Sequence, residues 1–250
     1  TGTLRKSAGA GTSQINEFNL YNAPSGVIDT LSGTLSFVGG TNSILGGSWT
    51  ATAPGLMSLA GGTWTDAGAS ASGSGTNRFH GGTLNLRTNI IPGLFLTGGE
   101  IFVTGTNTFQ QAGAITNLTL DGARLKGTNR IGSGVLTANN GALDGLLTVQ
   151  PGGQLLLATT ATKLVHWLTL INQGTVTWSG GTLSGGSTPT TVISNGGLWQ
   201  ITGDNVFNNP FGGPPMTWTN TGTLRKSAGA GTSQINEFVF ANQASGLIQA

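Results

Sequence analysis

The chain has 250 residues, no cysteine, and a formal net charge of +2 from ten basic and eight acidic residues. Glycine accounts for 44 residues and charged residues for 7%, against about a quarter in an average soluble domain. The missing cysteines exclude disulfides and thiol catalysis, and the absence of a clustered basic patch argues against nucleic-acid binding. No run of about 18 apolar residues occurs, so we predict no membrane insertion of this segment.

The first stretch of the chain returns near its end. Residues 1–18, TGTLRKSAGAGTSQINEF, recur unchanged as residues 221–238, at an offset of 220 residues. The similarity continues in relaxed form, since Asn22, Ser25, Gly26 and Ile28 recur as Asn242, Ser245, Gly246 and Ile248. We therefore predict that residues 1–220 form one long repeat unit and that residues 221–250 begin the next.

A shorter period runs through this unit. A glycine followed by an alternating apolar and polar segment recurs, mostly at spacings in the low twenties. The segments begin at residues 2, 33, 62, 82, 99, 122, 145, 174, 197 and 222. Short alternating runs bounded by glycine are typical of half-buried strands.

A second motif follows several of these strands. It has the sequence GTNSI at 40, GTNRF at 75, GTNTF at 105, GTNRI at 127 and GDNVF at 203. The fourth position varies among polar and apolar residues, as a solvent-facing site would, whereas the fifth is always Ile or Phe and is expected to face the core. Asparagine at the third position suits a turn.

Strands and corners repeated about every 22 residues predict an all-β parallel β-helix, or β-solenoid. We expect about 20–25 residues and about three short strands per coil, about ten coils in the 220-residue unit, and right-handed winding. The alternative, a sandwich or barrel of hairpins, requires regular two-residue turns, for which only Asn140-Gly141 and Asn195-Gly196 qualify.

Three stretches interrupt the rhythm. Residues 66–76 are small and flexible and are predicted to form a loop. Residues 160–172 are the most apolar run, and their β-branched residues favour strand over a short helix. Residues 205–217 contain three prolines, so we predict a protruding loop at the repeat junction. Its candidate residues are Phe207, Pro210, Phe211, Pro214 and Pro215.

One set of charged residues suggests catalysis. Asp121 and Asp144 share the context Leu-Asp-Gly and lie 23 residues apart, so they could stack in adjacent coils beside Arg124. Stacked carboxylates can act as acid and base, but an aspartate before glycine is also ordinary turn chemistry. We favour the turn and predict no enzyme activity, no cofactor and no metal site, because the two histidines lack companions at ligand spacing.

The six tryptophans raise the possibility of carbohydrate binding. In the segments TWT at 63–65 and 217–219 the tryptophan faces away from its threonine neighbours, so we predict that Trp64 and Trp218 lie in the core. A carbohydrate-binding module would need at least two exposed tryptophans on one face.

The Gly-Thr-Leu strands, the GTN corners and the segment TNTGTLRKS resemble repeats of large bacterial surface and secreted proteins, of the adhesin, filamentous-haemagglutinin and autotransporter-passenger class. The resemblance implies an extracellular or cell-surface scaffold, such as a fibre or filament, with cell-surface glycans or matrix among its partners.

The ends of a solenoid expose strand edges, and neither end of this chain resembles a polar cap. We therefore expect stacking on copies of itself, either in tandem or end to end. A ladder of amide hydrogen bonds is predicted at one corner. Its members are Asn42, Asn77, Asn107, Asn129 and Asn205.

Overall fold

The computed structural model describes residues 2–86, 91, 93–96, 100–109 and 117–250. Within these ranges the chain has no helix, and parallel strands stack into a β-solenoid of about 10 turns with about 22 residues per turn. The predicted fold class is therefore confirmed, while the hand of the winding stays a prediction. The chain divides into two compact units, residues 1–105 with 121–123 and residues 106–120 with 124–250.

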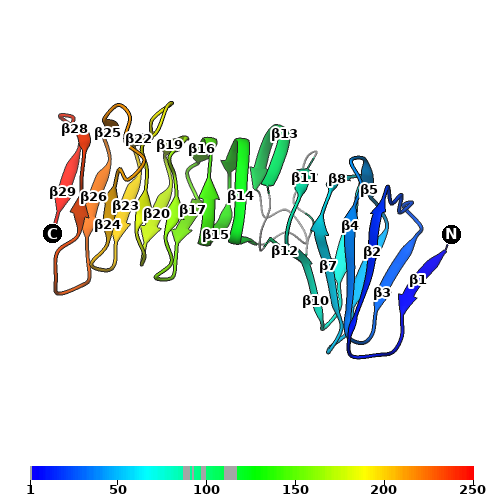
Figure 1. Ribbon diagram of the computed structural model, residues 1–250. Coiled ribbons are helices and arrows are strands. Elements are labelled where there is room, and N and C mark those ends of the chain that lie inside the picture. Colours follow the sequence, from blue (N-terminus) through cyan, green and yellow to red (C-terminus); the bar gives the residue numbers. More distant parts are fainter. Residues whose placement is uncertain (1, 87–90, 92, 97–99, 110–116) are drawn as a thin grey trace. The chain divides into compact units, whose positions relative to one another are not determined.

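Unit 1 contains three stacks of parallel strands (Figure 1). The first stack consists of β1 (Thr3–Lys6), β3 (Val27–Thr30), β6 (Ser48–Ala51) and β9 (Ser70–Ser72). The second consists of β2 (Thr12–Phe18), β4 (Thr34–Gly39), β7 (Leu56–Gly61), β10 (Thr76–Phe79) and β12 (Leu94–Leu96). The third contains β5 (Ser43–Leu45), β8 (Thr63–Asp66), β11 (Thr83–Leu86) and β13 (Glu100–Phe109).

Unit 2 also has three stacks, which we call A, B and C. Stack A comprises the first half of β15 (Gly134–Leu143), β17 (Gly153–Leu157), β20 (Thr175–Trp178), β23 (Leu198–Ile201), β26 (Thr223–Lys226) and β29 (Leu247–Gln249). Stack B comprises the end of β15, β18 (Lys163–Leu164), β21 (Leu183–Ser184), β24 (Val206–Asn208) and β27 (Gln234–Ile235). Stack C comprises the end of β14 (Asn117–Ile131), β16 (Gly145–Val149), β19 (Leu168–Asn172), β22 (Val192–Asn195), β25 (Met216–Asn220) and β28 (Phe238–Asn242).

Alternation along each strand decides which side chains fill the interior. In β20 the threonines are half-buried while Val176 and Trp178 are fully buried, and the same alternation holds in β8 and β23. Trp64 and Trp218 are 0% exposed, as the TWT segments predicted. Rings in successive coils then contact each other, as with Trp199 and Trp218, whose centroids lie 4.5 Å apart.

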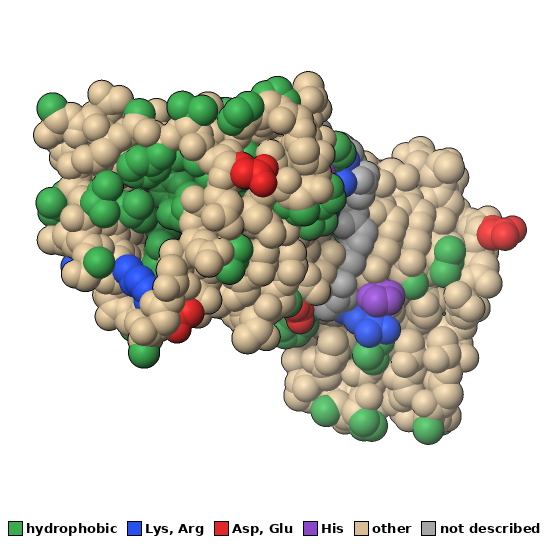
Figure 2. Space-filling model, turned by 60° about the vertical axis from the view of Figure 1, so that its left-hand side comes forward, with side chains coloured by type: hydrophobic (Ala, Val, Ile, Leu, Met, Phe, Trp, Pro, Cys, Tyr) green, Lys and Arg blue, Asp and Glu red, His purple; other side chains and the backbone are tan. Residues whose placement is uncertain are grey.

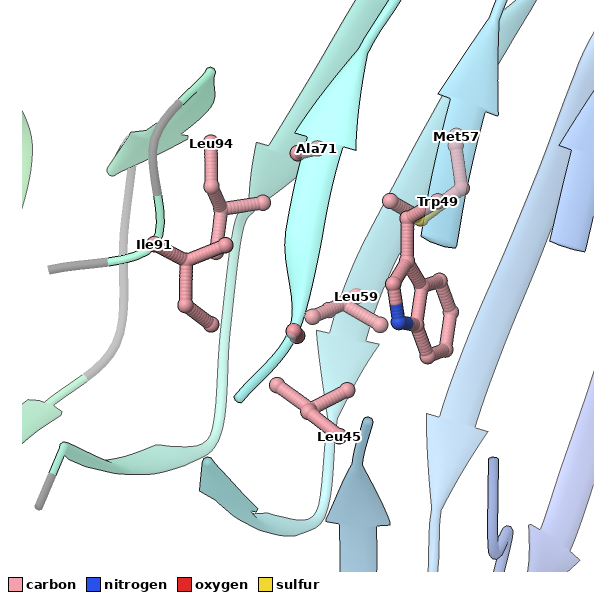
Figure 3. A pocket seen from close by; sticks show the side chains of 8 residues that line it. Leu45, Trp49, Met57, Leu59, Ala71, Ile91 and Leu94 are labelled. Carbon is pink, nitrogen blue, oxygen red and sulfur yellow. The ribbon is translucent and has the colours of Figure 1, made fainter. Parts of the chain in front are cut away.

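The interior of unit 1 is closed by side chains from all three stacks. Leu45, Trp49, Met57, Leu59 and Leu94 converge there (Figure 3). They leave a cavity of only about 10 Å³, about the space of a single water molecule, with an entirely apolar lining. This interior is therefore packed core and not a ligand site.

The two copies of the repeated sequence share part of their local structure, although residues 12–18 form one strand in the first copy, whereas only Gln234–Ile235 and the start of β28 are strand in the second. Thr3 pairs with Val27 and Thr223 pairs with Leu247, so the strand register is the same in both copies. Glu17 and Glu237 both adopt a left-handed backbone, with φ of 56° and 61°. This conformation is uncommon for a residue other than glycine, so its recurrence shows that the repeated residues specify the same turn at this position.

Of the irregular stretches, the first contradicts its prediction and the second confirms it. Residues 66–76 were expected to be a loop, but they contain β9, which pairs in parallel with β6. Backbone hydrogen bonds hold this strand in its stack, so small side chains suffice. Residues 160–172 form β18 and β19, as their β-branched residues predicted.

Candidate functional site

The most regular polar feature of unit 2 is a ladder of asparagine side chains along stack C. Asn172 Nδ2 donates to Asn195 Oδ1 at 2.6 Å, Asn195 Nδ2 donates to Asn220 Oδ1 at 2.7 Å, and Asn220 Nδ2 donates to Asn242 Oδ1 at 2.7 Å. The first three side chains are 0% exposed. Four successive coils are thus joined by amide-to-amide bonds parallel to the stacking direction.

The asparagine side chains of the ladder also donate hydrogen bonds to the backbone of the following coil. Asn172 Nδ2 lies 3.0 Å from Leu198 O, and Asn195 Nδ2 lies 3.1 Å from Thr223 O. Because both amide hydrogens of each of the three buried side chains have acceptors, the burial of these polar groups is offset by hydrogen bonds. The four asparagines each end a strand of stack C. Those strands have the sequences LTLIN, VISN, MTWTN and FVFAN, which is the signal that could have located the ladder.

The asparagines of the GTN motifs behave differently from the expectation. Asn77, Asn129 and Asn205 are buried, but their Nδ2 atoms donate to backbone carbonyls, those of Ser72, Lys126 and Trp178. Asn129 lies in stack C and Asn205 precedes a strand of stack B. Asn42 is exposed, and the side chain of Asn107 lies outside the described residues. The amide ladder therefore occurs on residues other than those predicted.

The fifth position of these motifs faces the core in three of the four motifs whose side chain is described there; in the fourth, Ile44 is half-buried between the fully buried Ser43 and Leu45. Phe79, Ile131 and Phe207 are 0%, 0% and 1% exposed. The motifs at 75 and 203 precede or begin a strand, whereas the motif at 127 ends β14. The buried Asn77 and Asn129 bond to the backbone a few residues before them, and Asn205 bonds to Trp178 O in another coil.

The charged residues predicted as a catalytic alternative do not share one environment. Asp121 is exposed, whereas Asp144 is 6% exposed and its Oδ2 lies 2.8 Å from Arg124 Nε in an ion pair. The Arg124 guanidinium also lies 5.0 Å from the Trp167 ring centroid. Asp144 and Arg124 therefore form a partly buried ion pair against an aromatic ring, which is a common structural arrangement.

His166 completes this cluster and was not expected there. Its Nε2 lies 3.1 Å from Arg124 Nη2, and its ring centroid is 4.3 Å from that of Trp167 and 4.8 Å from that of Phe211. Arginine can only donate, so Nε2 accepts and the neutral ring carries its proton on Nδ1. Burial lowers the pKa of His166, the Asp144 carboxylate opposes this effect, and Arg124 adds to it. The ring is thus neutral near pH 7 and packs against the rings of Trp167 and Phe211.

Other candidate chemistry is sparse in the described ranges. No group of three or more His, Asp or Glu side chains could hold a metal ion in the part of the chain that the structure describes. Of the six tryptophans, Trp167 is 38% exposed and the other five are at most 2% exposed. A tryptophan pair for stacking sugars is therefore not present. Over the same ranges, nothing helical has the length and apolar character that a membrane crossing requires.

An open groove of about 410 Å³ lies on unit 1. Its lining consists of Glu17, Asn19, Gly39, Gly40, Thr41, Gly62 and Thr63. Glu17 is the only charged residue among these seven, so the groove offers no convergent set of groups for catalysis.

The predicted junction loop is shorter than residues 205–217. Phe207 belongs to β24, is 1% exposed and pairs with Leu183 and Ile235, so placing it in the loop was wrong. The prolines lie outside strands as expected, and Pro210, Phe211, Pro214 and Pro215 are all exposed. Proline cannot take part in an interior strand, but this restriction applies at Pro210 itself. Phe207, three residues earlier, can therefore still belong to a strand.

Comparison of the chain with protein-family models, curated proteins and solved structures finds no significant match. The fold and the contacts described above are therefore the basis for any functional argument.

Proposed function

We propose that this chain is a structural repeat segment of a β-solenoid fibre or stalk, in which copies follow one another in tandem. The observation that carries the proposal is the recurrence of residues 1–18 as residues 221–238 with the same strand register and the same backbone conformation at Glu17 and Glu237. A unit whose last coil repeats the sequence and the strand register of its first coil can be followed by a copy of itself in the same register.

The contacts at the repeat junction support this role. In the second copy, Lys226 Nζ lies 2.9 Å from Asp204 Oδ1, and Asp204 Oδ2 accepts from the backbone of Gly231. The hydrogen bond from Lys226 and the one from Gly231 lower the pKa of Asp204. The coil before the repeat thus supplies a carboxylate that engages two groups of the repeated sequence.

We further propose an extracellular or cell-surface location on a bacterium, in an adhesin or related fibre. The absence of cysteine, the low charge and the resemblance of the Gly-Thr-Leu and GTN segments to surface-protein repeats support it. Copies of the chain are the main partners, and cell-surface glycans or matrix are the external ones. The role requires no enzyme activity, cofactor or nucleic acid.

An extended chain tests the structural proposal. Residues 31–250 would follow Ala250 a second time, so that residues 221–250 take the place of residues 1–30 in the added unit. We expect solution scattering and electron microscopy to show a particle lengthened by about ten coils, or roughly 48 Å at about 4.8 Å per coil. In the matched control, a Gly/Ser linker replaces the central copy of residues 221–238. We expect a hinge or two separate globules only in the control. The same hinge or globules in the unaltered extended chain would refute the proposal.

A further inference from the structure

We propose that the dipeptide Asn140-Gly141 is a site of spontaneous deamidation, whereas Asn195-Gly196 is protected from the same reaction by the fold. These are the two Asn-Gly dipeptides of the chain. In this reaction the backbone nitrogen of the glycine bonds to the side-chain carbon of the preceding asparagine. Glycine permits the approach most readily because it has no Cβ. The inference concerns a covalent change in the chain itself and does not depend on the proposed function.

Asn140 lies in β15, where this strand passes from stack A to stack B. Its side chain is exposed, and its Oδ1 accepts a hydrogen bond from Gly141 N at 2.7 Å. The Cγ carbon is bonded to Oδ1 at about 1.2 Å, so Gly141 N lies within about 4 Å of the carbon that it attacks. Groups about 3–3.5 Å apart are close to reaction, and a small rotation of the exposed side chain completes the approach.

Asn195 has the same sequence context but a different environment. Its side chain is 0% exposed, accepts a hydrogen bond from Asn172 and donates to Asn220 and to Thr223 O. The nitrogen of Gly196 donates to Asn172 O at 2.7 Å, in the preceding coil. Both reacting groups are thus engaged with other residues, and the side chain must leave the ladder before it can react.

The reaction consumes water and needs no other partner. The lone pair of Gly141 N forms a bond to Asn140 Cγ, and the bond from Cγ to the side-chain nitrogen breaks. The proton of Gly141 N leaves with this nitrogen as ammonia, and a cyclic imide remains. Water then opens the ring at either of its two carbonyls. One product has aspartate in place of asparagine, and the other has an isoaspartyl linkage, in which the backbone passes through the former side-chain carbon.

Either product changes both charge and geometry at this corner. The chain has eight acidic residues, and one added carboxylate lowers its formal net charge from +2 to +1. Acidic side chains are few on the face of the molecule that Figure 2 shows, so the added charge alters a sparsely charged surface. The isoaspartyl product also adds one carbon to the backbone just before Gly141 and Ala142, which pair with Lys163 and Leu164. We therefore expect aspartate to leave stack B intact and isoaspartate to disturb this pairing.

Peptide mapping by mass spectrometry tests the proposal on the folded chain after storage in mildly alkaline buffer. We expect deamidation at Asn140, with aspartate and isoaspartate as products. Asn195 should react more slowly by on the order of tenfold or more, because its hydrogen bonds must first break. The matched control is the chain unfolded in guanidinium, in which both dipeptides should react at similar rates. Similar rates at the two sites in the folded chain, or an unreacted Asn140 there while the unfolded chain reacts, overturns the proposal.

A second measurement assigns the change in charge to this residue. Cation-exchange chromatography should resolve a more acidic species in the stored wild-type chain. This species should be strongly reduced in Asn140→Gln, because the longer side chain closes a ring less readily. Asn140→Asp should match the fresh wild-type chain in urea unfolding, whereas the isoaspartyl fraction should be less stable. An acidic species that forms equally fast in Asn140→Gln would refute the assignment.

Discussion

Substitution of Asn195 by leucine should reveal how much the amide ladder stabilises the solenoid. Leucine has nearly the shape of asparagine, so the substitution removes the polar bonds without opening a large cavity. It deletes the acceptor for Asn172, the donor to Asn220 and the donor to Thr223 O, which are three bonds of 2.6, 2.7 and 3.1 Å.

The cost follows from what each partner loses. At about 1 kcal/mol per net hydrogen bond, three lost bonds amount to about 3 kcal/mol. Asn172 Nδ2 keeps its bond to Leu198 O, whereas Asn220 Oδ1 loses the donor that Asn195 supplies. A buried acceptor without a donor costs about 1–3 kcal/mol, so we expect a total of about 4 kcal/mol.

Urea unfolding followed by circular dichroism measures this loss. Asn242→Leu is the matched control, because Asn242 is exposed, accepts only the last ladder bond from Asn220 and donates one exposed bond to Gly246 O. It should cost about 1 kcal/mol. The double variant Asn172→Leu with Asn195→Leu should cost less than the sum of the single variants, because both remove one shared bond. An Asn195→Leu protein no less stable than Asn242→Leu would refute the reasoning.

Three further predictions concern the packed interior. Lys163 is 0% exposed, and burial lowers its pKa to about 8 from 10.5, so the folded state binds fewer protons than the unfolded state between these pH values. The free energy of unfolding should therefore rise by about 3 kcal/mol from pH 8 to 10.5, and this rise should disappear in Lys163→Met, measured by urea unfolding at several pH values. Gly62→Ala should destabilise by more than about 1 kcal/mol, because Gly62 has φ of 86° and an added Cβ would lie 2.2 Å from Gly39 O; an unchanged melting temperature would contradict this. Trp199→Ala should cost about 3–5 kcal/mol through loss of its packing on Trp218, and a change below 1 kcal/mol in urea unfolding would show that this contact is not part of the stabilising core.

Sequence reasoning succeeded where the relevant information is local. Alternation with period two placed Trp64 and Trp218 in the core, since neighbouring residues in a strand point to opposite sides. Glycine spacing predicted short strands and about ten coils, because turns with a left-handed backbone favour glycine. Residues 1–18 and 221–238 are identical, and the strands that begin the two copies pair in the same register with the strands that follow them.

The sequence did not predict contacts that depend on stacking. Phe207 was assigned to a loop from the nearby prolines, yet it fills a core position because Leu183 and Ile235 lie on either side of it. His166 gave no signal for its place beside Arg124 and Phe211, since these two residues come from other coils.

The amide ladder shows most clearly what can be predicted from the sequence and what depends on the tertiary structure. Sequence by itself determined that this chain forms parallel coils of about 22 residues and that a ladder of asparagines suits such a stack. Only the tertiary structure decided which asparagines form it. The ladder spacings are 23, 25 and 22 residues, so which residues reach the same height depends on the length of every intervening turn. The physical reason is that backbone pairing between coils sets the register, and side chains such as Asn172 and Asn195 then meet where that pairing places them.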